Sequence, residues 1–204
     1  MYKLFFKRSI DLVLSLVGFL ILTPITAIVF VALVFINKGK PIFLQQRPGK
    51  DEKIFSIIKF KTMGDGKDAN GDLLPDEERI TRFGTFLRKT SMDEIPQLIN
   101  IIKGDMSLIG PRPLKVSYLP YYTTKESIRH SVRPGITGLA QISGRSLLGW
   151  DDRLQKDIEY VENLSFGLDC KILVQTFLKV ITAKDVALDS ESGVIDFDAF
   201  RKGE

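Results

Sequence analysis

Two adjacent carboxylates, Asp93 and Glu94, precede an apolar helical pattern in the stretch RKTSMDEIPQLINIIKGDMSLIGPRP, Arg88 to Pro113. By spacing alone this is a capping box, since Ser91 to Glu94 has the form S-x-x-E, in which Ser91 binds the amide of Glu94 and Glu94 reaches back. A second interpretation is chemical. A carboxylate in the first turn of a helix stays ionised in the positive field of that helix end, which also attracts phosphate groups. Asp93 is then a candidate nucleophile, and Glu94, about 100° further round the helix, flanks the same site.

Such a site needs positive charge, because a carboxylate that attacks an anionic phosphorus must overcome charge repulsion. Mg²⁺ and several Lys or Arg side chains would supply it. Candidates close to turns rich in Gly and Pro are Lys59, Arg88, Arg112 and Arg145. Two prolines flank Arg112 and restrain its backbone to an extended form. For each cation taken singly, a surface charge or a contact to anionic lipid is the simpler interpretation.

Composition excludes several other sites. One cysteine, Cys170, and one histidine, His130, exclude a disulfide framework and a Cys/His zinc site, and a Ser-His-Asp triad would depend on His130 alone. The chain lacks a Walker loop, G-x-G-x-x-G and H-E-x-x-H. Its net charge of +4, from 29 Lys and Arg against 25 Asp and Glu, is too small to indicate nucleic acid and suits a membrane surface as well. A chain of 204 residues with 44% apolar residues suits one folded core plus a membrane segment.

The uncharged segment from Leu12 to Ile36 belongs in a bilayer. Its 25 residues reach roughly 37 Å as a helix, more than the roughly 30 Å of a hydrocarbon core. Thr23 and Pro24 lie near its middle, where proline removes a hydrogen bond and the threonine hydroxyl can satisfy a freed carbonyl. Basic residues flank both ends: Lys3, Lys7 and Arg8 before it, and Lys38, Lys40, Arg47, Lys50 and Lys53 after it. Two cytoplasmic flanks favour a re-entrant helix, and a kinked spanning helix remains the alternative.

The remaining patterns predict an α+β, mostly helical fold with a small antiparallel sheet. PIFLQQR and KIFSIIKFKT predict two strands joined by a turn. Helices are predicted at Arg79–Arg88, Met92–Lys103 with Gly104 as the stop, and Trp150–Val161, whereas SLIGPRP and VRPGITGLAQISGR are typical of loops around a site. Ser165–Ile181 places a set of apolar residues at helical spacing: Phe166, Cys170, Leu173, Phe177 and Ile181. That face packs against the core or, alternatively, lies in the lipid interface.

These motifs together resemble the bacterial monotopic phosphoglycosyl transferases, also called bacterial sugar transferases. The resemblance runs from Lys7 to about Ile181. It rests on KRSIDLVLS, GKPIFLQQRPG, IIKFKTM, ITRFGTFLRKTSMDEIPQLINIIKGDMSLIGPRP, VRPGITGLAQISGR and LDCKIL. The Asp-Glu pair matches the catalytic dyad of that family. One departure is Lys61, where the family has arginine, and lysine cannot form the bidentate fork of arginine.

The resemblance implies transfer of a sugar 1-phosphate from a UDP-sugar to polyprenyl (undecaprenyl) phosphate, with release of UMP. By this analogy Asp93 forms a covalent phosphosugar intermediate, Glu94 assists as a metal or acid/base partner, and Mg²⁺ bridges Asp93 and the diphosphate. Lys59, Arg88, Arg112 and Arg145 would contact phosphate or uridine. The implied N-terminal helix is re-entrant, and the implied location is the cytoplasmic face of the bacterial inner membrane.

The expected organisation is a membrane helix over residues 1–37, a catalytic domain over 38–183 and a C-terminal extension over 184–204. The chain lacks the N-terminal multi-helix region of longer members and is similar to the enzymes that transfer diacetylbacillosamine 1-phosphate for protein N-glycosylation. An alternative donor is a hexose or N-acetylhexosamine for capsule, exopolysaccharide or lipooligosaccharide. A different class of protein, a non-catalytic adaptor that binds anionic lipid, would not require Asp93. The oligomeric state is not legible from these patterns.

Overall fold

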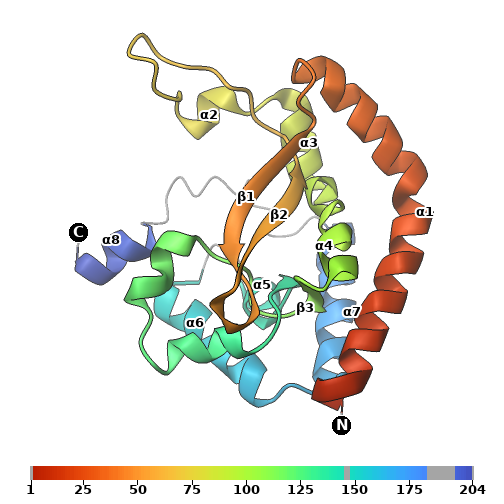
Figure 1. Ribbon diagram of the computed structural model, residues 1–204, viewed down its shortest axis with the longest axis vertical. Helices are drawn as coiled ribbons and strands as arrows, with labels where there is room; N and C mark the ends of the chain where they lie inside the picture. Colours follow the sequence, from red (N-terminus) through yellow and green to blue (C-terminus); the bar gives the residue numbers. More distant parts are fainter. Residues whose placement is uncertain (1, 145–147, 183–195, 204) are drawn as a thin grey trace.

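The computed structural model describes residues 2–144, 148–182 and 196–203. A long N-terminal helix runs along one side of the molecule, a β-hairpin lies near its middle, and shorter helices surround the hairpin (Figure 1). The helical elements are η1 (Tyr2–Phe6), α1 (Lys7–Ile36), η2 (Lys50–Glu52), α2 (Asp76–Arg79), α3 (Arg82–Lys89), η3 (Met92–Glu94), α4 (Gln97–Lys103), η4 (Val116–Tyr121), η5 (Glu126–Ser131), α5 (Leu139–Ser143), α6 (Trp150–Glu162), α7 (Phe166–Thr182) and α8 (Phe197–Lys202). The strands are β1 (Ile42–Pro48), β2 (Ile54–Phe60), β3 (Ser107–Ile109) and β4 (Gly135–Thr137). The predicted α+β, mostly helical class is confirmed.

The predicted antiparallel pair is the hairpin of β1 and β2, in register with Phe43 opposite Lys59. Alternate residues of a strand share a face. On β2 one face buries Ile57 in a cluster with Leu98 and Ile101 of α4. Lys59, two residues further on, lies on that same face. The apolar packing of the hairpin on α4 therefore brings a lysine over the segment that precedes α4.

The two Gly/Pro-punctuated pieces were predicted as loops, and this is only partly correct. They contain β3 and β4, which pair in parallel with Ser107 opposite Gly135, and also α5. A Cβ on Gly135 would collide with the backbone nitrogen of Gly110, so this pairing depends on glycine at the point of closest approach. Three-residue strands that pair across a wide sequence separation leave no local periodicity to detect.

Two predicted helices are broken in the structure. The helix predicted at Arg79–Arg88 is α2 followed by α3, because Ile80 is extended and bridges to Met63 while the Thr81 hydroxyl caps the amide of Gly84. The helix predicted at Met92–Lys103 is the 3₁₀ turn η3 followed by α4. Its stop at Gly104 is confirmed in the left-handed conformation. The last predicted helix, Trp150–Val161, is confirmed as α6.

α1 runs along one side of the molecule and is long and apolar enough to cross a membrane (Figure 1). Pro24 lies inside this helix, which continues through it, and the Thr23 hydroxyl donates to the carbonyl of Phe19 at 2.7 Å. That carbonyl is not the one proline frees, which belongs to Leu20 four residues before it, so the predicted compensation by Thr23 is wrong. The re-entrant path of the helix stays a prediction.

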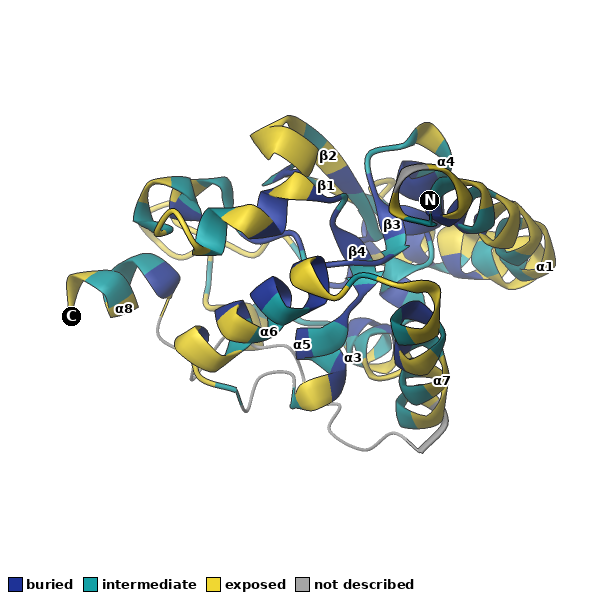
Figure 2. Cartoon of the chain, turned by 90° about the horizontal axis from the view of Figure 1, so that it is seen from below, coloured by how far each residue is buried: buried dark blue, intermediate teal, exposed yellow. Residues whose placement is uncertain are grey.

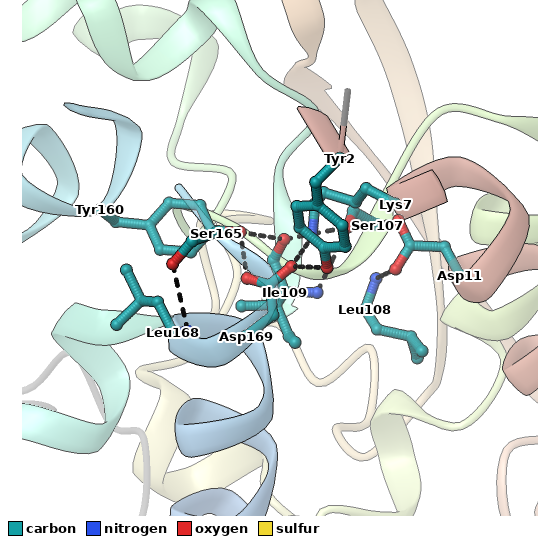
Figure 3. A network of polar contacts seen from close by, with 10 residues as sticks. All are labelled: Tyr2, Lys7, Asp11, Ser107, Leu108, Ile109, Tyr160, Ser165, Leu168 and Asp169. Carbon is teal, nitrogen blue, oxygen red and sulfur yellow. Dashed lines mark hydrogen bonds and ion pairs between the residues drawn. The ribbon is translucent and has the colours of Figure 1, made fainter. Parts of the chain in front are cut away.

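Both ends of α1 contact the same folded unit. At the start, the Lys7 ammonium donates to Asp169 of α7 at 2.7 Å, and the Asp11 carboxylate accepts from the Ser107 hydroxyl at 2.7 Å (Figure 3). Near the end, Val29 and Leu33 are buried with Phe60 and Leu87 of the domain, and the Asn37 side chain donates to the carbonyl of Lys61 at 2.7 Å. The helix is therefore attached to the domain near both of its ends.

The Lys7–Asp169 pair is a specific test of this attachment, since its side chains are only 11% and 4% exposed. Removing one partner of a buried pair typically costs about 3–5 kcal/mol because the other charge stays buried. We expect Lys7→Met to lower Tm in detergent by about 10 °C. Thermal unfolding would measure this, with Lys171→Met on the exposed side of α7 as the control. Equal Tm values for the two variants would contradict the prediction.

The predicted packing face of α7 is wrong. Ile172 and Asp169 are buried, whereas Phe166 and Phe177 of the predicted face are 55% and 66% exposed. The exposed apolar residues of this helix are Phe166, Val174, Phe177, Leu178 and Val180. Figure 2 shows α7 on the same side of the molecule as α1, with exposed residues along both helices. The alternative, in which this face lies in the lipid interface, stays a prediction.

Candidate functional site

Four separate pieces of chain bring the predicted charged residues together. β2 carries Lys59, α3 carries Arg88, η3 carries Asp93 and Glu94, and the segment after β3 carries Arg112. These five residues form what we call the Asp93 cluster. The fourth predicted cation, Arg145, lies outside the described residues. Lys61 is not part of the cluster, because its ammonium is paired with the carboxylate of Asp65 at 2.6 Å.

The carboxylates sit on a tight turn and not on an α-helix, so the predicted capping box is wrong. Ser91 adopts a left-handed conformation with φ of 55°, and its side chain makes no capping hydrogen bond. Pro96 lies between η3 and α4 and has no N–H to extend an α-helical ladder backwards. The turn therefore presents Asp93, which is 9% exposed, and Glu94 toward β2.

Glu94 is the centre of the charge network. Its Oε1 accepts a hydrogen bond from Lys59 Nζ at 2.8 Å and another from Arg112 Nη2 at 3.0 Å. Burial acts to raise the pKa of Glu94, but Lys59 and Arg112 outweigh it and hold this pKa well below its ordinary value. Glu94 is consequently an anion at neutral pH in the free protein.

The pKa of Asp93 is shifted in the opposite direction. Burial raises the pKa of its carboxyl to about 6, and the neighbouring charge of Glu94 adds to this, while Lys59, Arg112 and Arg88 oppose it. The two carboxylates thus divide into a group that is anionic at neutral pH and a more basic group that binds a proton more readily. Strongly perturbed neighbouring carboxylates are typical of functional sites.

Arg88 completes the cluster from α3. Its Nε donates to the Thr62 hydroxyl at 3.0 Å, and its Nη2 lies 2.9 Å from the sulfur of Met63. α3 can come this close because position 84 is glycine, since a Cβ there would collide with the carbonyl oxygen of Thr62. Arg88 is thereby held at the end of β2, where its charge acts on Asp93.

The predicted magnesium ion can be tested against this donor set. Among the described residues no group of three or more His, Cys, Asp or Glu side chains is placed to hold a metal. Mg²⁺, however, is commonly held by one or two carboxylates together with water and substrate phosphates. The Asp93 carboxylate fits such a site, and Glu94, already bonded to two cations, fits a supporting role.

Sequence reasoning missed a buried arginine next to the cluster. Arg129 of η5 is 3% exposed and pairs with Asp157 of α6 at 2.8 Å. It also donates to the main-chain carbonyl of Arg112 at 2.7 Å. Neither Arg129 nor Asp157 lies in a pattern that distinguishes it from a surface charge. Only their common burial reveals the pair.

The single histidine lies beside this pair and belongs to no triad. His130 is 6% exposed, and neither ring nitrogen forms a hydrogen bond with a described residue. Burial, assisted by the charge of Arg129, lowers the pKa of His130 to about 4. The nearest acid is Glu52, 3.6 Å from Nδ1, and Tyr122 packs edge-on against the ring. The imidazole is neutral at pH 7.

His130 predicts a pH dependence of stability. The folded pKa of about 4 is below the unfolded value of 6.5, so protonation favours the unfolded chain and stability falls as the pH drops from 6.5 to 4. The loss is on the order of 2–3 kcal/mol. We expect His130→Phe to remove this part of the acid sensitivity, measured as Tm at pH 7 against pH 4.5. The same decrease in both proteins would show that other groups cause it.

Comparisons with known proteins agree with the geometry. A family model described as bacterial sugar transferase matches residues 2–183. The uncharacterized sugar transferase EpsL of Bacillus subtilis is 47% identical over 181 residues, which cover 88% of this chain and 89% of that protein. The galactosyl transferase CpsE of Streptococcus agalactiae is 40% identical, over 86% of this chain and 42% of its own length. An Escherichia coli UDP-glucose:undecaprenyl-phosphate glucose-1-phosphate transferase is 36% identical, over 85% of this chain and 39% of its own length.

Proposed function

The chain is an enzyme of the bacterial sugar transferase family, and from that premise we propose that it transfers a sugar 1-phosphate from a UDP-sugar to polyprenyl phosphate. The observation that carries the proposal is the Asp93 cluster, in which a buried, basic carboxylate stands beside three cations on a domain attached to an apolar helix. Relatives named as undecaprenyl-phosphate sugar phosphotransferases support the same reaction class.

The proposed chemistry has two displacements at one phosphorus. The Asp93 carboxylate attacks the phosphorus that bears the sugar, the bond from this phosphorus to the UMP oxygen breaks, and UMP leaves. A phosphate oxygen of the polyprenyl acceptor then attacks the same phosphorus, which releases the Asp93 carboxylate and gives the polyprenyl-diphosphate sugar. Dividing the transfer in this way lets two anionic substrates use the site in turn. The scheme predicts ping-pong kinetics.

The residues of the cluster have separate tasks in this scheme. Lys59, Arg88 and Arg112 offset the negative charge of the diphosphate. Asp93, with Glu94 in support, would hold Mg²⁺, which would neutralise charge on the diphosphate oxygens. Because Glu94 is held as an anion by Lys59 and Arg112, we assign it the role of orienting these two cations and supporting the metal, and not that of an acid.

The acceptor determines where the enzyme must lie. A polyprenyl phosphate keeps its tail in the bilayer and its phosphate at the headgroups, so the site must sit at the membrane surface. We propose that α1 enters and leaves the bilayer on the cytoplasmic side. Support comes from the contacts of both of its ends with one domain, at Lys7 and at Leu33, because a spanning helix would place one of these ends on the side of the membrane opposite to the domain. Labelling of a cysteine introduced at Lys3 from the periplasm would contradict this.

The donor sugar is a finer question. The relatives with named donors act on glucose, galactose or N-acetylgalactosamine, and this favours a hexose or N-acetylhexosamine donor for assembly of a surface glycan. The diacetylbacillosamine donor for protein N-glycosylation stays a prediction from the resemblance.

The test is UMP release by detergent-purified protein with polyprenyl phosphate and Mg²⁺ across a panel of UDP-sugars that includes both kinds. Release with one donor that stops on chelation of Mg²⁺ is the expected result. If the folded protein releases no UMP with any donor of the panel, but binds anionic vesicles in a salt-sensitive manner, this would support the lipid-binding adaptor instead.

A further inference from the structure

Arg129 connects three parts of the molecule through one buried guanidinium. Its Nε and Nη2 donate to the Asp157 carboxylate at 3.0 and 2.8 Å, and its Nη1 donates to the Tyr122 hydroxyl at 3.1 Å. Nη2 also donates to the carbonyl oxygen of Arg112 at 2.7 Å. A buried ion pair is weak evidence for stability by itself, because desolvation of two charges offsets most of their attraction. The bond to Arg112 is the contact that points toward the Asp93 cluster.

The segment from Ile109 to Pro113 is held by its carbonyl groups. The Tyr160 hydroxyl donates to the carbonyl of Ile109 at 3.0 Å, and the amide of Gly135 donates to that of Pro111 at 3.0 Å. The next carbonyl, that of Arg112, is the one that Arg129 holds. Pro113 restricts the backbone of the residue before it. Together these contacts set the point from which the Arg112 side chain departs.

The side chain that departs there is functional in the proposed reaction. Arg112 Nη2 reaches Glu94 at 3.0 Å, and this side chain is 36% exposed. A guanidinium binds a carboxylate or phosphate through a planar fork, which works only if the group arrives at the right angle. The hydrogen bond from Arg129 to the Arg112 carbonyl fixes the main chain from which this fork extends, and so contributes to the angle at which the guanidinium arrives.

We propose that Arg129 is a positioning residue for Arg112. It fixes the Arg112 main chain through the carbonyl, and Asp157 and Tyr122 hold the Arg129 guanidinium in the orientation that does so. The inference rests on the proposed phosphosugar transfer, for which Arg112 is one of the phosphate-facing cations. Arg129 itself touches no substrate in this proposal and acts only through Arg112.

The C-terminal helix α8 packs against Tyr122, the residue whose hydroxyl accepts a hydrogen bond from Arg129. Tyr122 stacks on Phe197 of α8, with ring centroids 5.2 Å apart and planes at 29°, and Phe197 is fully buried between Tyr118 and Trp150 as well. Residues 196–203 lie beyond the part of the chain that the family model matches. This aromatic contact packs against the Tyr122 ring, whose hydroxyl accepts the hydrogen bond from Arg129 Nη1.

A double-mutant cycle tests the proposal. Arg129→Lys keeps the charge beside Asp157 but cannot hold the carboxylate and the carbonyl together. We expect it to lower kcat/KM for UMP release about 30-fold in the wild-type background. In an Arg112→Lys background, where the flexible ammonium depends less on its backbone, the same change should cost less than about 3-fold. Equal losses in both backgrounds would show a general structural effect and overturn the proposal, as would full activity of Arg129→Lys alone.

The matched control is Arg133→Lys, since Arg133 also donates to a main-chain carbonyl, that of Gly104 at 2.8 Å. This variant should leave kcat/KM within about 3-fold of wild type. If Arg129→Lys fails to fold, Tyr122→Phe replaces it in the same double-mutant cycle, because it deletes only the hydroxyl that accepts a hydrogen bond from Arg129. A smaller loss of about 5-fold that disappears with Arg112→Lys is expected, and a loss independent of Arg112 would overturn the proposal.

Failure of the proposed function is read separately. If the wild-type protein releases no UMP with any of the UDP-sugars, the proposed reaction is wrong. The positioning of Arg112 is then tested by calorimetric binding of UDP with Mg²⁺ to the same four proteins. In these measurements, Arg129→Lys should weaken the binding of UDP about 10-fold in the protein that keeps Arg112. In the Arg112→Lys background the same substitution should change the affinity little. Unchanged binding with Arg112 present would overturn the proposal.

Discussion

Asp93→Asn is expected to reduce UMP release at least about 10⁴-fold, because the amide that replaces the carboxylate is not a nucleophile of comparable strength. The side chains have nearly the same size, so the site should keep its shape. The variant should also be at least as stable as the wild type. Burial and Glu94 raise the pKa of Asp93 to about 6, which means that the ionised carboxylate destabilises the fold at neutral pH by on the order of 1–3 kcal/mol.

Two measurements check this expectation. Intact-mass spectrometry of wild type incubated with the donor and Mg²⁺, without polyprenyl phosphate, should show an added sugar phosphate that is absent from Asp93→Asn. Tm should be unchanged or higher, with Asp152→Asn on the exposed face of α6 as the control for loss of one charge. Turnover by Asp93→Asn near the wild-type rate would remove the nucleophile assignment.

Glu94→Gln is expected to reduce kcat about 10²–10³-fold. The glutamine oxygen still accepts a hydrogen bond, but the charge that holds Lys59 at 2.8 Å and Arg112 at 3.0 Å is lost. Both cations are partly exposed, with side chains 22% and 36% accessible, so they can turn toward water once the anion is gone. The loss should appear mainly in kcat, since orientation of the reacting groups is what fails.

Glu94→Asp separates charge from geometry. It keeps the anion but shortens the side chain by one methylene, and we expect it to recover about 10-fold over Glu94→Gln. Steady-state kinetics at fixed Mg²⁺ would measure both, with Glu162→Gln at an exposed position as the control. If Glu94→Gln kept wild-type kcat, Glu94 would have no part in orienting the cations.

The local elements and the chemical residue types could be predicted from the sequence. Alternation in PIFLQQR and KIFSIIKFKT predicts β1 and β2, and Gly104 predicts the end of α4, because these features depend on residues close together in the chain. The Asp-Glu pair and three of its cations, Lys59, Arg88 and Arg112, were also identifiable. Resemblance to a family, and not spacing, favoured the chemical interpretation over a capping box.

Several features depend on contacts between distant segments and were therefore hidden. Ser91 leaves the helical conformation because η3 must turn Asp93 and Glu94 toward β2, and Ile80 is extended because it bridges to Met63. The apolar face with Phe166 and Phe177 was expected to pack against the core or to lie in the lipid interface, and the structure leaves both residues exposed while it buries Ile172 and the Asp169 carboxylate that pairs with Lys7. Apolar spacing cannot distinguish a face that meets the core from one that meets lipid.

The amino-acid sequence by itself determined the apolar N-terminal helix and the residues able to carry charge, because these follow from residue type and local period, and its motifs indicated the family. Only the tertiary structure decided how the charges are divided. Asp93 and Glu94 are neighbours of the same type, and burial with two cations against one of them makes one basic and the other a permanent anion. The proposed role of Arg129 also depends on the folded structure. Its function follows from the carbonyl of Arg112, 17 residues away along the chain, and a contact across that separation exists only once the chain has folded.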